Sequence, residues 1–413
     1  MRYTNRITGQ ILAGTLALSV GFGAMTSAFG QSLTWLGTWG SGSLYYAEAQ
    51  GVSADGTVVV GWGGVYSPHV AFRWTSSTGM QDIGQLVSGR DTEAWGISDD
   101  GRVIVGYGLI GGGAYRGFRW ENGVFTQFGT FGGSNSWAWD ASADGSVIVG
   151  FAALNTGFNR AFRWTASEGM VNLGTLPGDI RSVARAVSAD GSVVVGWSSG
   201  DFGHRAFRWA NGVMTNIHNP ALYESEAIGV SGDGNVVVGA WGPDLLTPAK
   251  PFRWTAEEGM VNLGTLGGDW GEAWDANYDG SIVVGWSEVS PGNWHAFRWT
   301  VSGGMEDLNV TYASLLGSGD ILSWAAAISP DGRYIVGNGT NGATGDTEAF
   351  LLDTWRTGDT NGDGCIDDSD LLAVLFAFGT PGTGLTRHED INKDGIVDDA
   401  DLLIVLFNFG QGC

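Results

Sequence analysis

Ala186-Val-Ser-Ala-Asp190-Gly-Ser-Val-Val-Val-Gly196-Trp197 is a stretch whose close copies recur along most of the chain. Its Asp-Gly step occurs at positions 55, 100, 144, 190, 233, 279 and 331, with spacings between 43 and 52 residues. A period of that size in a strand-rich sequence is typical of a repeat architecture. Asp-Gly is also a strong hairpin signal, because Gly tolerates positive φ. The stretch therefore predicts one hairpin in each of seven repeats, with Asp190 as a turn residue.

Turn residues divide each repeat into four short strands. In order, examples are Ala94-Trp-Gly-Ile-Ser98, Val193-Val-Val-Gly196, a Phe-Arg-Trp strand and Val171-Asn-Leu-Gly-Thr-Leu176. The third strand begins at Phe72, Phe118, Phe162, Phe207, Phe252 and Phe297, and its last copy is the variant Phe350-Leu-Leu. Four strands in roughly 45 residues is the size of one β-propeller blade.

Two unpaired strand sequences predict how the ring closes. After Phe350 the chain runs to Trp355 without a fourth strand, whereas Thr34-Trp-Leu36-Gly37-Thr38-Trp39 is a fourth-strand sequence that precedes the first repeat. A last blade that borrows its outer strand from the N-terminus uses both sequences and leaves no open edge. We therefore expect residues 31–357 to form an all-β, seven-bladed β-propeller closed by an N-terminal strand.

The repeats also resemble a known family. Units such as Arg160-Ala-Phe-Arg-Trp164, followed by Gly-Met-x-x-Leu-Gly-Thr-Leu and preceded by Ser-x-Asp-Gly-x-Val-Val-Val-Gly, are similar to the bacterial HAF extracellular repeat over residues 33–352. The resemblance implies an extracellular setting and a β-rich repeat fold, and it brings no catalytic residues. Three segments depart from it, at Asn277-Tyr-Asp-Gly280, Phe350-Leu-Leu and Asn216-Ile-His-Asn219.

The Phe-Arg-Trp strand places its Arg on the opposite sheet face from Phe and Trp. Because blades stack face to face, this Arg needs an acceptor, either a backbone carbonyl or the turn Asp of its own or the neighbouring blade. The alternative is a ring of anion-binding arginines formed by Arg73 and its counterparts. Recurrence in every blade favours the structural role.

Function is expected on the face that carries the dissimilar connections, those from strand two to three and from strand four to the next repeat. Aromatic rings beside carboxylates suit sugar recognition, since a pyranose stacks on a ring while its hydroxyls donate to acids. The predicted ligand-binding residues on this face are Tyr115, Trp241, Trp270, Trp294, His204 and Asp269.

Four glutamates, each at the start of an inner strand, are the catalytic candidates if the protein is an enzyme: Glu48, Glu93, Glu226 and Glu272. Glycoside hydrolysis needs two carboxylates about 5 to 9.5 Å apart in different protonation states, and the sequence does not fix their separation. A solvated glutamate, or one paired with a neighbouring Arg, is the alternative.

The two ends of the chain indicate export. Arg2 and Arg6 precede an apolar run from Ile11 to Met25 and the small-residue site Ser-Ala28-Phe29-Gly30, so residues 1–30 are predicted to be a secretory signal peptide. The formal net charge of −23 disfavours nucleic acid and anionic membranes as partners and favours cations. We expect a secreted protein without a membrane span, with a monomeric propeller. The only cysteines, Cys365 and Cys413, are expected to form a disulfide.

From Gly358 the composition changes, and two twelve-residue loops place oxygen donors at the spacing that wraps a chain around Ca²⁺. Positions 1, 3, 5, 9 and 12 supply side chains and position 7 a backbone carbonyl. The predicted ligands of two calcium ions are Asp359, Asn361, Asp363, Cys365 (backbone O), Asp367 and Asp370, and then Asp390, Asn392, Asp394, Ile396 (backbone O), Asp398 and Asp401. Short apolar helices are expected over 371–378 and 402–409, stopped by Gly379 and Gly410.

Duplicated loop-helix units with Asp at position 12 resemble a type I dockerin over residues 358–413, which implies docking onto a cohesin-like partner. Positions 10 and 11, Asp368-Ser369 and Asp399-Ala400, differ from the hydroxyl pairs common in that family, so generic surface attachment is the alternative. Eleven acids against Arg387 and Lys393 predict that this domain folds only with metal.

Three functions follow from these patterns. The first is a secreted, non-catalytic binding or adhesion propeller, with polysaccharide as a possible ligand, attached to a surface or a cohesin-like partner through the calcium-dependent tail. The second is a secreted glycosidase or lyase that uses the funnel carboxylates. The third is a structural surface component. The sequence leans away from an enzyme without deciding the point.

Overall fold

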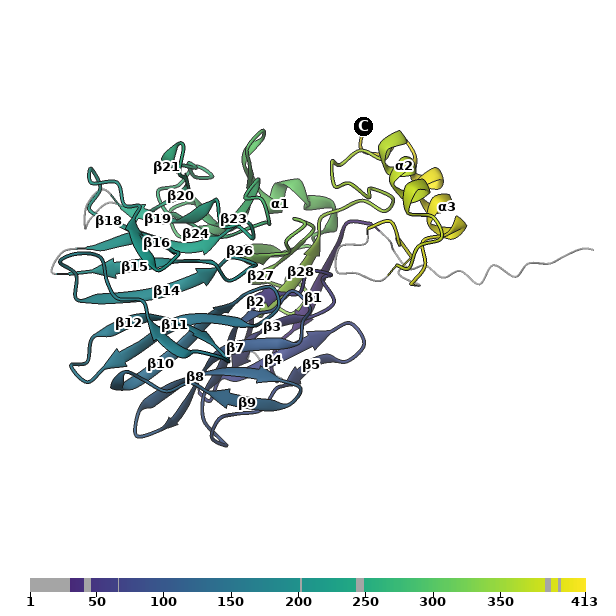
Figure 1. Cartoon of the computed structure of the whole chain (residues 1–413). Coiled ribbons are helices and arrows are strands. Elements are labelled where there is room, and N and C mark those ends of the chain that lie inside the picture. Colours follow the sequence, from purple (N-terminus) through teal and green to yellow (C-terminus); the bar gives the residue numbers. More distant parts are fainter. Residues whose placement is uncertain are drawn as a thin grey trace, which may run out of the picture.

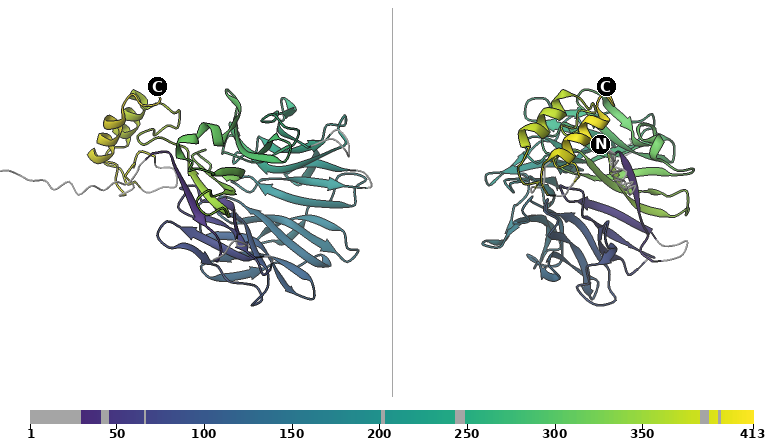
Figure 2. Two further views of the ribbon diagram at one scale, coloured as in Figure 1. Left: turned by 180° about the vertical axis from the view of Figure 1, so that it is seen from behind. Right: turned by 90° about the vertical axis from the view of Figure 1, so that its right-hand side faces the viewer.

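Seven four-stranded antiparallel sheets make up most of this computed structural model. The structure describes residues 30–40, 46–65, 67–200, 203–242, 249–382, 388–392 and 395–413. Residues 1–29 of the predicted signal peptide and the predicted ligand Asp394 lie outside that range. The sheets follow one another around a ring, and the two helices of the tail lie at one side of it, near the last sheet (Figures 1 and 2).

Each sheet is one blade. In six of them the four strands run in chain order from the centre of the ring outward, and in the seventh the outermost strand is the N-terminal β1. The inner strands are β2 (Tyr46–Val52), β6 (Thr92–Ile97), β10 (Gly132–Ala141), β14 (Arg181–Val187), β18 (Glu224–Val230), β22 (Gly271–Ala276) and β26 (Ile321–Ile328). The second strands are β3 (Val59–Gly64), β7 (Val103–Gly111), β11 (Val147–Leu154), β15 (Val193–Ser199), β19 (Val237–Gly242), β23 (Ile282–Ser290) and β27 (Tyr334–Thr340).

The two outer positions complete the blades. The third strands are β4 (Val70–Thr75), β8 (Ala114–Glu121), β12 (Asn159–Thr165), β16 (His204–Ala210), β20 (Lys250–Thr255), β24 (Asn293–Thr300) and β28 (Thr347–Asp353). The outermost strands are β5 (Gly79–Asp82), β9 (Val124–Gln127), β13 (Gly169–Asn172), β17 (Val213–Asn216), β21 (Gly259–Asn262), β25 (Gly304–Asp307) and, from the N-terminus, β1 (Ser32–Gly37). We number the blades 1 to 7 from β2 to β28.

Strand exchange closes the ring, as the sequence predicted. Strand β1 pairs antiparallel with β28, with Ser32 opposite Asp353 and Gly37 opposite Ala349. Trp35 packs edge-on against Phe350 with 6.1 Å between ring centroids, and its Nε1–H donates to Asp320 Oδ2 at 3.1 Å. The seventh sheet therefore has the order β1-β28-β27-β26, and the outer edge of β28 is covered.

The apolar core lies between the blades and is built from the repeated residues. The phenylalanine of every third strand, from Phe72 to Phe350, is fully buried. It packs with the small alanine of the inner strand and the valines of the second strand, as around Phe207, where Ala184 and Val194 belong to the same apolar cluster. Replacing one such phenylalanine by alanine removes buried apolar area and leaves a cavity, which lowers the free energy of unfolding by about 3–5 kcal/mol.

The Asp-Gly hairpin has the expected structural role. Asp190 Oδ1 accepts from Ser188 Oγ at 2.7 Å and from the Ser192 N–H at 2.9 Å, and these hydrogen bonds, that of the Ser192 amide first, lower the pKa of Asp190. The repeated arginine is also structural. Arg163 Nε–H donates to the carbonyl of Gly191, in the turn of the next blade, at 3.2 Å, and Arg208 and Arg253 repeat this contact at Gly234 and Gly280.

The fourth strand is displaced from its expected position. The sequence predicts a strand over 171–176, but β13 spans Gly169–Asn172. The strand ends there because Asn172 Oδ1 accepts from the Gly174 N–H at 2.9 Å, while Gly174 adopts a φ of +78°. The Leu-Gly-Thr-Leu segment turns inward instead, and Leu176 becomes buried in the core between blades 3 and 4.

Two helices form the tail, α2 (Asp368–Ala377) and α3 (Asp399–Asn408), and each begins three residues earlier than expected. The reason is a capping box. The Asp367 side chain accepts a hydrogen bond from the helix backbone, and the Asp370 side chain accepts one from the Asp367 N–H. Cys365 and Cys413 are joined by a disulfide with 4.8 Å between their Cα atoms, which confirms the predicted pairing. Two short turns, α1 (Leu308–Thr311) and η1 (Ala313–Leu315), follow β25.

Candidate functional site

The face that carries the dissimilar connections contains a ring of side chains in three positions of each blade. One residue precedes the buried Ala of the inner strand, one follows the Gly of the second strand, and one stands three residues before the Phe of the third strand. The antiparallel register pairs the first two directly, as with Glu48 and Trp62 in blade 1 or Glu272 and Trp286 in blade 6. We call the space around these side chains, between one blade and the next, a groove. The binding chemistry of each groove depends on which residues occupy the three positions.

In blades 1 and 2 the groove is closed by a histidine clamp. The His69 imidazole lies over the Trp62 indole with 4.6 Å between centroids, and its Nδ1–H donates to Glu93 Oε1 of blade 2 at 2.7 Å. The Tyr107 hydroxyl and the Trp95 Nε1–H donate to the other oxygen of Glu93. Burial, and then the Glu93 carboxylate, raise the pKa of Tyr107. Glu93 is nearly buried and held by three donors, which is a structural arrangement.

Blades 4 and 5 have a second clamp, formed by residues at the equivalent positions. The His204 imidazole stacks on Trp197 with 4.0 Å between centroids and an interplanar angle of 10°. Its Nδ1–H donates to Glu226 of blade 5. Of the two residues that the sequence nominated here, His204 and Glu226, each is therefore the other's partner, and neither lines the cavity described below.

Blade 6 has no such clamp on its indole. Trp294 occupies the histidine position but stands edge-on to Trp286, at 6.4 Å and 86°, and no other ring in the described residues stacks on Trp286. Blade 7 carries Trp324 where blades 2 and 5 carry Glu93 and Glu226. Because Trp294 stands edge-on instead of lying over Trp286, the face of that indole is left uncovered by a ring.

A cavity of about 440 Å³ lies between blades 6 and 7. It is lined by five tryptophans and two glutamates, namely Trp270, Trp274, Trp286, Trp294, Trp324, Glu272 and Glu288. Trp270 and Trp294 are 45% and 43% exposed, so they form an accessible rim. An aromatic concave site with a few fixed polar groups is what small-molecule recognition requires. This cavity is the candidate site.

The two carboxylates of the cavity are fixed by donors from the protein. Glu272 Oε2 accepts the indole N–H of Trp274 at 2.8 Å and that of Trp286 at 3.3 Å. Glu288 accepts the backbone N–H of Asp269 at 2.9 Å and of Gly292 at 2.8 Å. The Asp269 amide contributes most to lowering the pKa of Glu288, with the Gly292 amide next, so Glu288 is negatively charged at neutral pH.

Other nominated residues lie elsewhere. Trp241 packs partly buried against the apolar cluster around Phe252. Tyr115 lies in blade 2, edge-on to Tyr107 and Trp137. Asp269 is an exposed residue at the cavity rim, and its backbone carbonyl accepts from Lys250 Nζ.

Four residues of the cavity were not predicted as ligand-binding residues, namely Trp274, Trp286, Trp324 and Glu288. For Trp324 a signal was present, because it occupies the inner-strand position that holds glutamate in four other blades.

Glu48 has a different environment from the other three ring glutamates. Burial, and then the nearby Glu93 carboxylate, raise the pKa of Glu48 to about 7, while His69 opposes the shift. The Tyr46 hydroxyl lies 3.2 Å from His69 Nε2 in the same group. Blades 1 and 2 thus hold a carboxyl that is partly protonated near neutral pH beside a second, hydrogen-bonded carboxylate.

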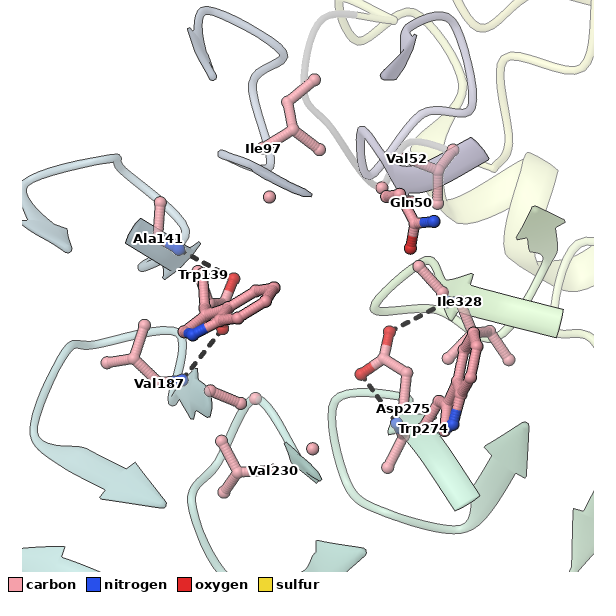
Figure 3. A pocket seen from close by; sticks show the side chains of 18 of the residues that line it. Gln50, Val52, Ile97, Trp139, Ala141, Val187, Val230, Trp274, Asp275 and Ile328 are labelled. Atoms are coloured by element: carbon pink, nitrogen blue, oxygen red, sulfur yellow. Dashed lines mark hydrogen bonds between the residues drawn. The ribbon is translucent and has the colours of Figure 1, made fainter. Parts of the chain in front are cut away.

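The centre of the ring contains a second cavity, of about 330 Å³ (Figure 3). Trp139 and Trp274 project into it from opposite sides, and Trp274 lines both cavities. Asp275 accepts the N–H of Ile328 in the neighbouring inner strand at 2.9 Å, and Asp140 accepts that of Val187 in the same way. Burial raises the pKa of each of these two carboxyls to about 7. They bridge adjacent blades from inside the channel.

The first predicted calcium loop forms a compact turn, and the described part of the second shows matching contacts. In the first loop, Asp370 is fully buried and its Oδ1 accepts the N–H groups of Thr360 and Asn361, while Asp359 accepts those of Gly362 and Gly364. In the second, Asp401 accepts from Ile391 and Asn392 in the same way. Across the described parts of the chain, no three His, Cys, Asp or Glu side chains converge closely enough to hold a metal ion.

Comparison with known proteins found similar solved structures but no related family. No family model matches the sequence, and no curated protein matches it. The putative TolB from Agrobacterium tumefaciens is 13% identical over 76% of this chain and 99% of that chain, with a TM-score of 0.46. Oligogalacturonate lyase from Vibrio parahaemolyticus is 11% identical over 78% and 93%, with a TM-score of 0.49.

A third similar structure is the β-propeller domain of the Trilobed protease from Pyrococcus furiosus, described as having an open velcro topology. It is 12% identical over 75% of this chain and 96% of that domain, with a TM-score of 0.48. At these identities the likeness concerns the fold alone. Within the described residues, no helix is long and apolar enough to cross a membrane.

Proposed function

We propose that this chain is a secreted, non-catalytic binding propeller that holds a saccharide in the cavity between blades 6 and 7 and is attached to a partner through its tail. The observation that carries the proposal is the cavity itself, where five indoles and two fixed carboxylates meet at the variable face. Indole faces stack on the apolar side of a pyranose ring, and carboxylates accept its hydroxyls.

The polar groups are arranged for binding a ligand in a fixed orientation. Glu272 takes both indole N–H donors on Oε2, so Oε1 has no hydrogen-bond partner among the described residues. This oxygen is the acceptor that a bound hydroxyl would use. Trp270 and Trp294 are exposed on the rim, and burial of their faces by a ligand would contribute roughly 25 cal/mol for each Å² of apolar surface.

A glycan array probed with the propeller tests this proposal, followed by measurement of affinity for the retained glycans. Trp294→Ala and Trp270→Ala should each weaken binding by about 10-fold or more, because each removes a stacking face worth 1–2 kcal/mol. Tyr278→Ala is the matched control, since Tyr278 is an exposed ring at the opposite end of the same blade. Retention of no glycan, or equal loss in all three variants, would contradict the proposal.

The tail supports attachment to a partner. Its helices expose apolar side chains in matching places, with Phe376 and Phe407 at 85% and 81% exposure. Leu372, Leu375, Leu403 and Leu406 are about half exposed beside them. An exposed apolar patch of this kind is typical of a protein interaction site. A cohesin-like or other surface protein is the partner that we propose, in an extracellular setting.

We also propose that the two loops of the tail bind calcium. Asp359 and Asp370 are buried and, within the described residues, neither has a Lys, Arg or His partner. Burial, together with the neighbouring Asp370 and Asp363 carboxylates, raises the pKa of Asp359 despite its two backbone hydrogen bonds. A bound cation would offset this concentration of negative charge, and the donor set of carboxylates, Asn361 and the Cys365 carbonyl is of the kind that Ca²⁺ prefers. Calcium would supply structural stability rather than chemistry.

A second candidate function is a carbohydrate-active enzyme, and the observation that favours it is Glu48. A carboxyl with a pKa of about 7 beside the Glu93 carboxylate offers a general acid and a base or nucleophile in one groove. Glu48→Gln and Glu93→Gln should each abolish turnover of a retained glycan if this function is correct. Binding without any turnover by the unmodified protein would leave the first proposal alone.

A further inference from the structure

Two blades show how this propeller covers an exposed indole beside a carboxylate. In blade 1 the His69 imidazole lies over Trp62 and donates to Glu93, and in blade 4 the His204 imidazole lies over Trp197 and donates to Glu226. In both cases a nitrogen donor that can carry positive charge sits on an indole face and next to a carboxylate. The arrangement combines a ring contact with a hydrogen bond to a carboxylate.

Blade 6 has both an indole, Trp286, and a carboxylate, Glu272, whereas each clamp joins the indole of one blade to the carboxylate of the next. Trp286 is paired with Glu272 across the strands, and Trp294 stands edge-on rather than over the indole face. The residue three before Phe252 in blade 5, which could approach Glu272 from the other side, is Ala249.

The backbone at Ala249 is placed as it is at His69. The Gly271 N–H donates to the Ala249 carbonyl at 3.0 Å, as the Thr92 N–H donates to the His69 carbonyl at 3.0 Å. Only the side chain is missing, so Glu272 has no imidazole from either neighbouring groove within the described residues.

The negative charge of the cavity favours a positively charged ligand. Glu288 is ionised and Glu272 accepts two indole N–H donors, while the lining contains no Lys, Arg or His. Five indoles provide negative π-faces toward any cation that enters. A neutral sugar would satisfy the stacking but would bring no positive charge to the two carboxylates. A ligand that carries a protonated amine satisfies both.

We infer that the cavity between blades 6 and 7 binds a protonated amino sugar, with its ammonium donating to Glu272 and its ring covering Trp286. The ammonium group then supplies the nitrogen donor that Ala249, at the position of His69, does not provide to Glu272. This inference rests on the proposed saccharide-binding function and names its ligand class. The excess of acids over bases in the whole chain would also draw a cationic saccharide toward the site.

The test compares a β-1,4-linked glucosamine tetrasaccharide with its fully N-acetylated counterpart and with a glucose tetrasaccharide, in calorimetric titrations of the full chain at neutral pH. We expect the glucosamine oligomer to bind about 10-fold or more tightly than either neutral oligomer. Glu272→Gln should remove that preference while retaining weak binding of the neutral oligomers, because the amide keeps the shape but not the charge. Glu226→Gln, at the same position of blade 5, is the matched control and should leave the preference intact.

Ala249→His provides a second test that adds a group instead of removing one. An imidazole at this position should engage Glu272 as His69 engages Glu93, and should reduce glucosamine binding by a similar factor. Equal affinity for all three oligomers, or a preference unchanged in Glu272→Gln, would overturn the inference and leave the saccharide-binding proposal standing. Absence of binding by every oligomer and by every glycan on the array would contradict both.

Discussion

The His204 imidazole lies face to face with the Trp197 indole, 4.0 Å between centroids, and its Nδ1–H donates to Glu226 in the following blade. A single side chain thus joins the second strand of its own blade to the inner strand of the next. His69, Trp62 and Glu93 join blades 1 and 2 in the same order, with the imidazole tilted by 34° to the indole. In blade 6 the histidine position holds Trp294 instead, and a cavity lies beside Trp286.

Removing the clamp should weaken the contact between blades 4 and 5. His204→Ala is expected to lower the free energy of unfolding by about 1–2 kcal/mol, because it removes an aromatic stack and leaves Glu226 without its donor. Urea denaturation followed by tryptophan fluorescence measures the change. Val213→Ala, an exposed position in the same blade, should change the stability by less than about 0.5 kcal/mol. Equal effects of the two substitutions would show that the clamp does not hold the blades together.

The strand-exchange seam should be a sensitive point of the ring. Trp35→Ala removes the edge-on contact with Phe350 and the hydrogen bond to Asp320. We expect a loss of about 2–4 kcal/mol and a lower melting temperature in calorimetry. Unchanged melting would mean that β1 contributes little to closure, contrary to its pairing with β28.

The channel aspartates should make stability depend on pH. Burial raises the pKa of Asp275 to about 7, whereas the pKa of an unfolded Asp is about 4. Between these values the folded protein binds more protons than the unfolded chain, so the free energy of unfolding falls as pH rises from about 4 to about 7. The fall amounts to about 1.4 kcal/mol for each unit of pKa shift.

Asp275→Asn removes that titration, so the variant should lose less stability than the unmodified protein when the pH is raised from 5 to 8. Chemical denaturation at the two pH values gives the comparison. Asp269→Asn, at an exposed carboxyl of the same blade, should leave the pH dependence unchanged. A parallel decline in the unmodified protein and in Asp275→Asn would refute the titration of Asp275 over this pH range.

Much of the scaffold could be predicted because its turn and strand residues recur in every repeat. Seven copies of the Asp190 turn and seven third strands gave the blade count, and the displaced Thr34–Trp39 sequence gave the closure by β1. The fourth strand was misplaced because a hydrophobic Leu-Gly-Thr-Leu run was taken for a strand. Whether such a run continues the sheet depends on the turn that Asn172 and Gly174 form.

The site was predicted only in part, for a geometric reason. The sequence placed Trp270, Trp294 and Glu272 on the binding face, but it could not show which groove is open. That depends on contacts between neighbouring blades, such as the hydrogen bond between His69 and Glu93, which are 24 residues apart in the sequence. It also depends on ring orientation, since Trp294 stands edge-on while His69 and His204 lie over their indoles.

The proposed calcium sites can be tested without the propeller's ligand. Calorimetric titration of the metal-free full chain with Ca²⁺ should show two sites, and Asp370→Ala should leave one, because it removes the carboxylate at position 12 of the first loop. Asp368→Ala removes an acid from the same first helical turn that is not at a ligand position, and it should retain both sites. No uptake by the unmodified chain, or equal uptake by all three proteins, would contradict the proposal.

The most direct test of the binding site is the response of the tryptophan indole N–H signals to a saccharide in ¹⁵N–¹H spectra, with assignments from single Trp→Phe variants. A ligand in the cavity between blades 6 and 7 should shift the signals of Trp270, Trp274, Trp286, Trp294 and Trp324 saturably, with one common dissociation constant. The signals of Trp62 and Trp197, which lie under His69 and His204, should stay in place. Saturable shifts at Trp62 and Trp197, with the five cavity signals unmoved, would contradict the account.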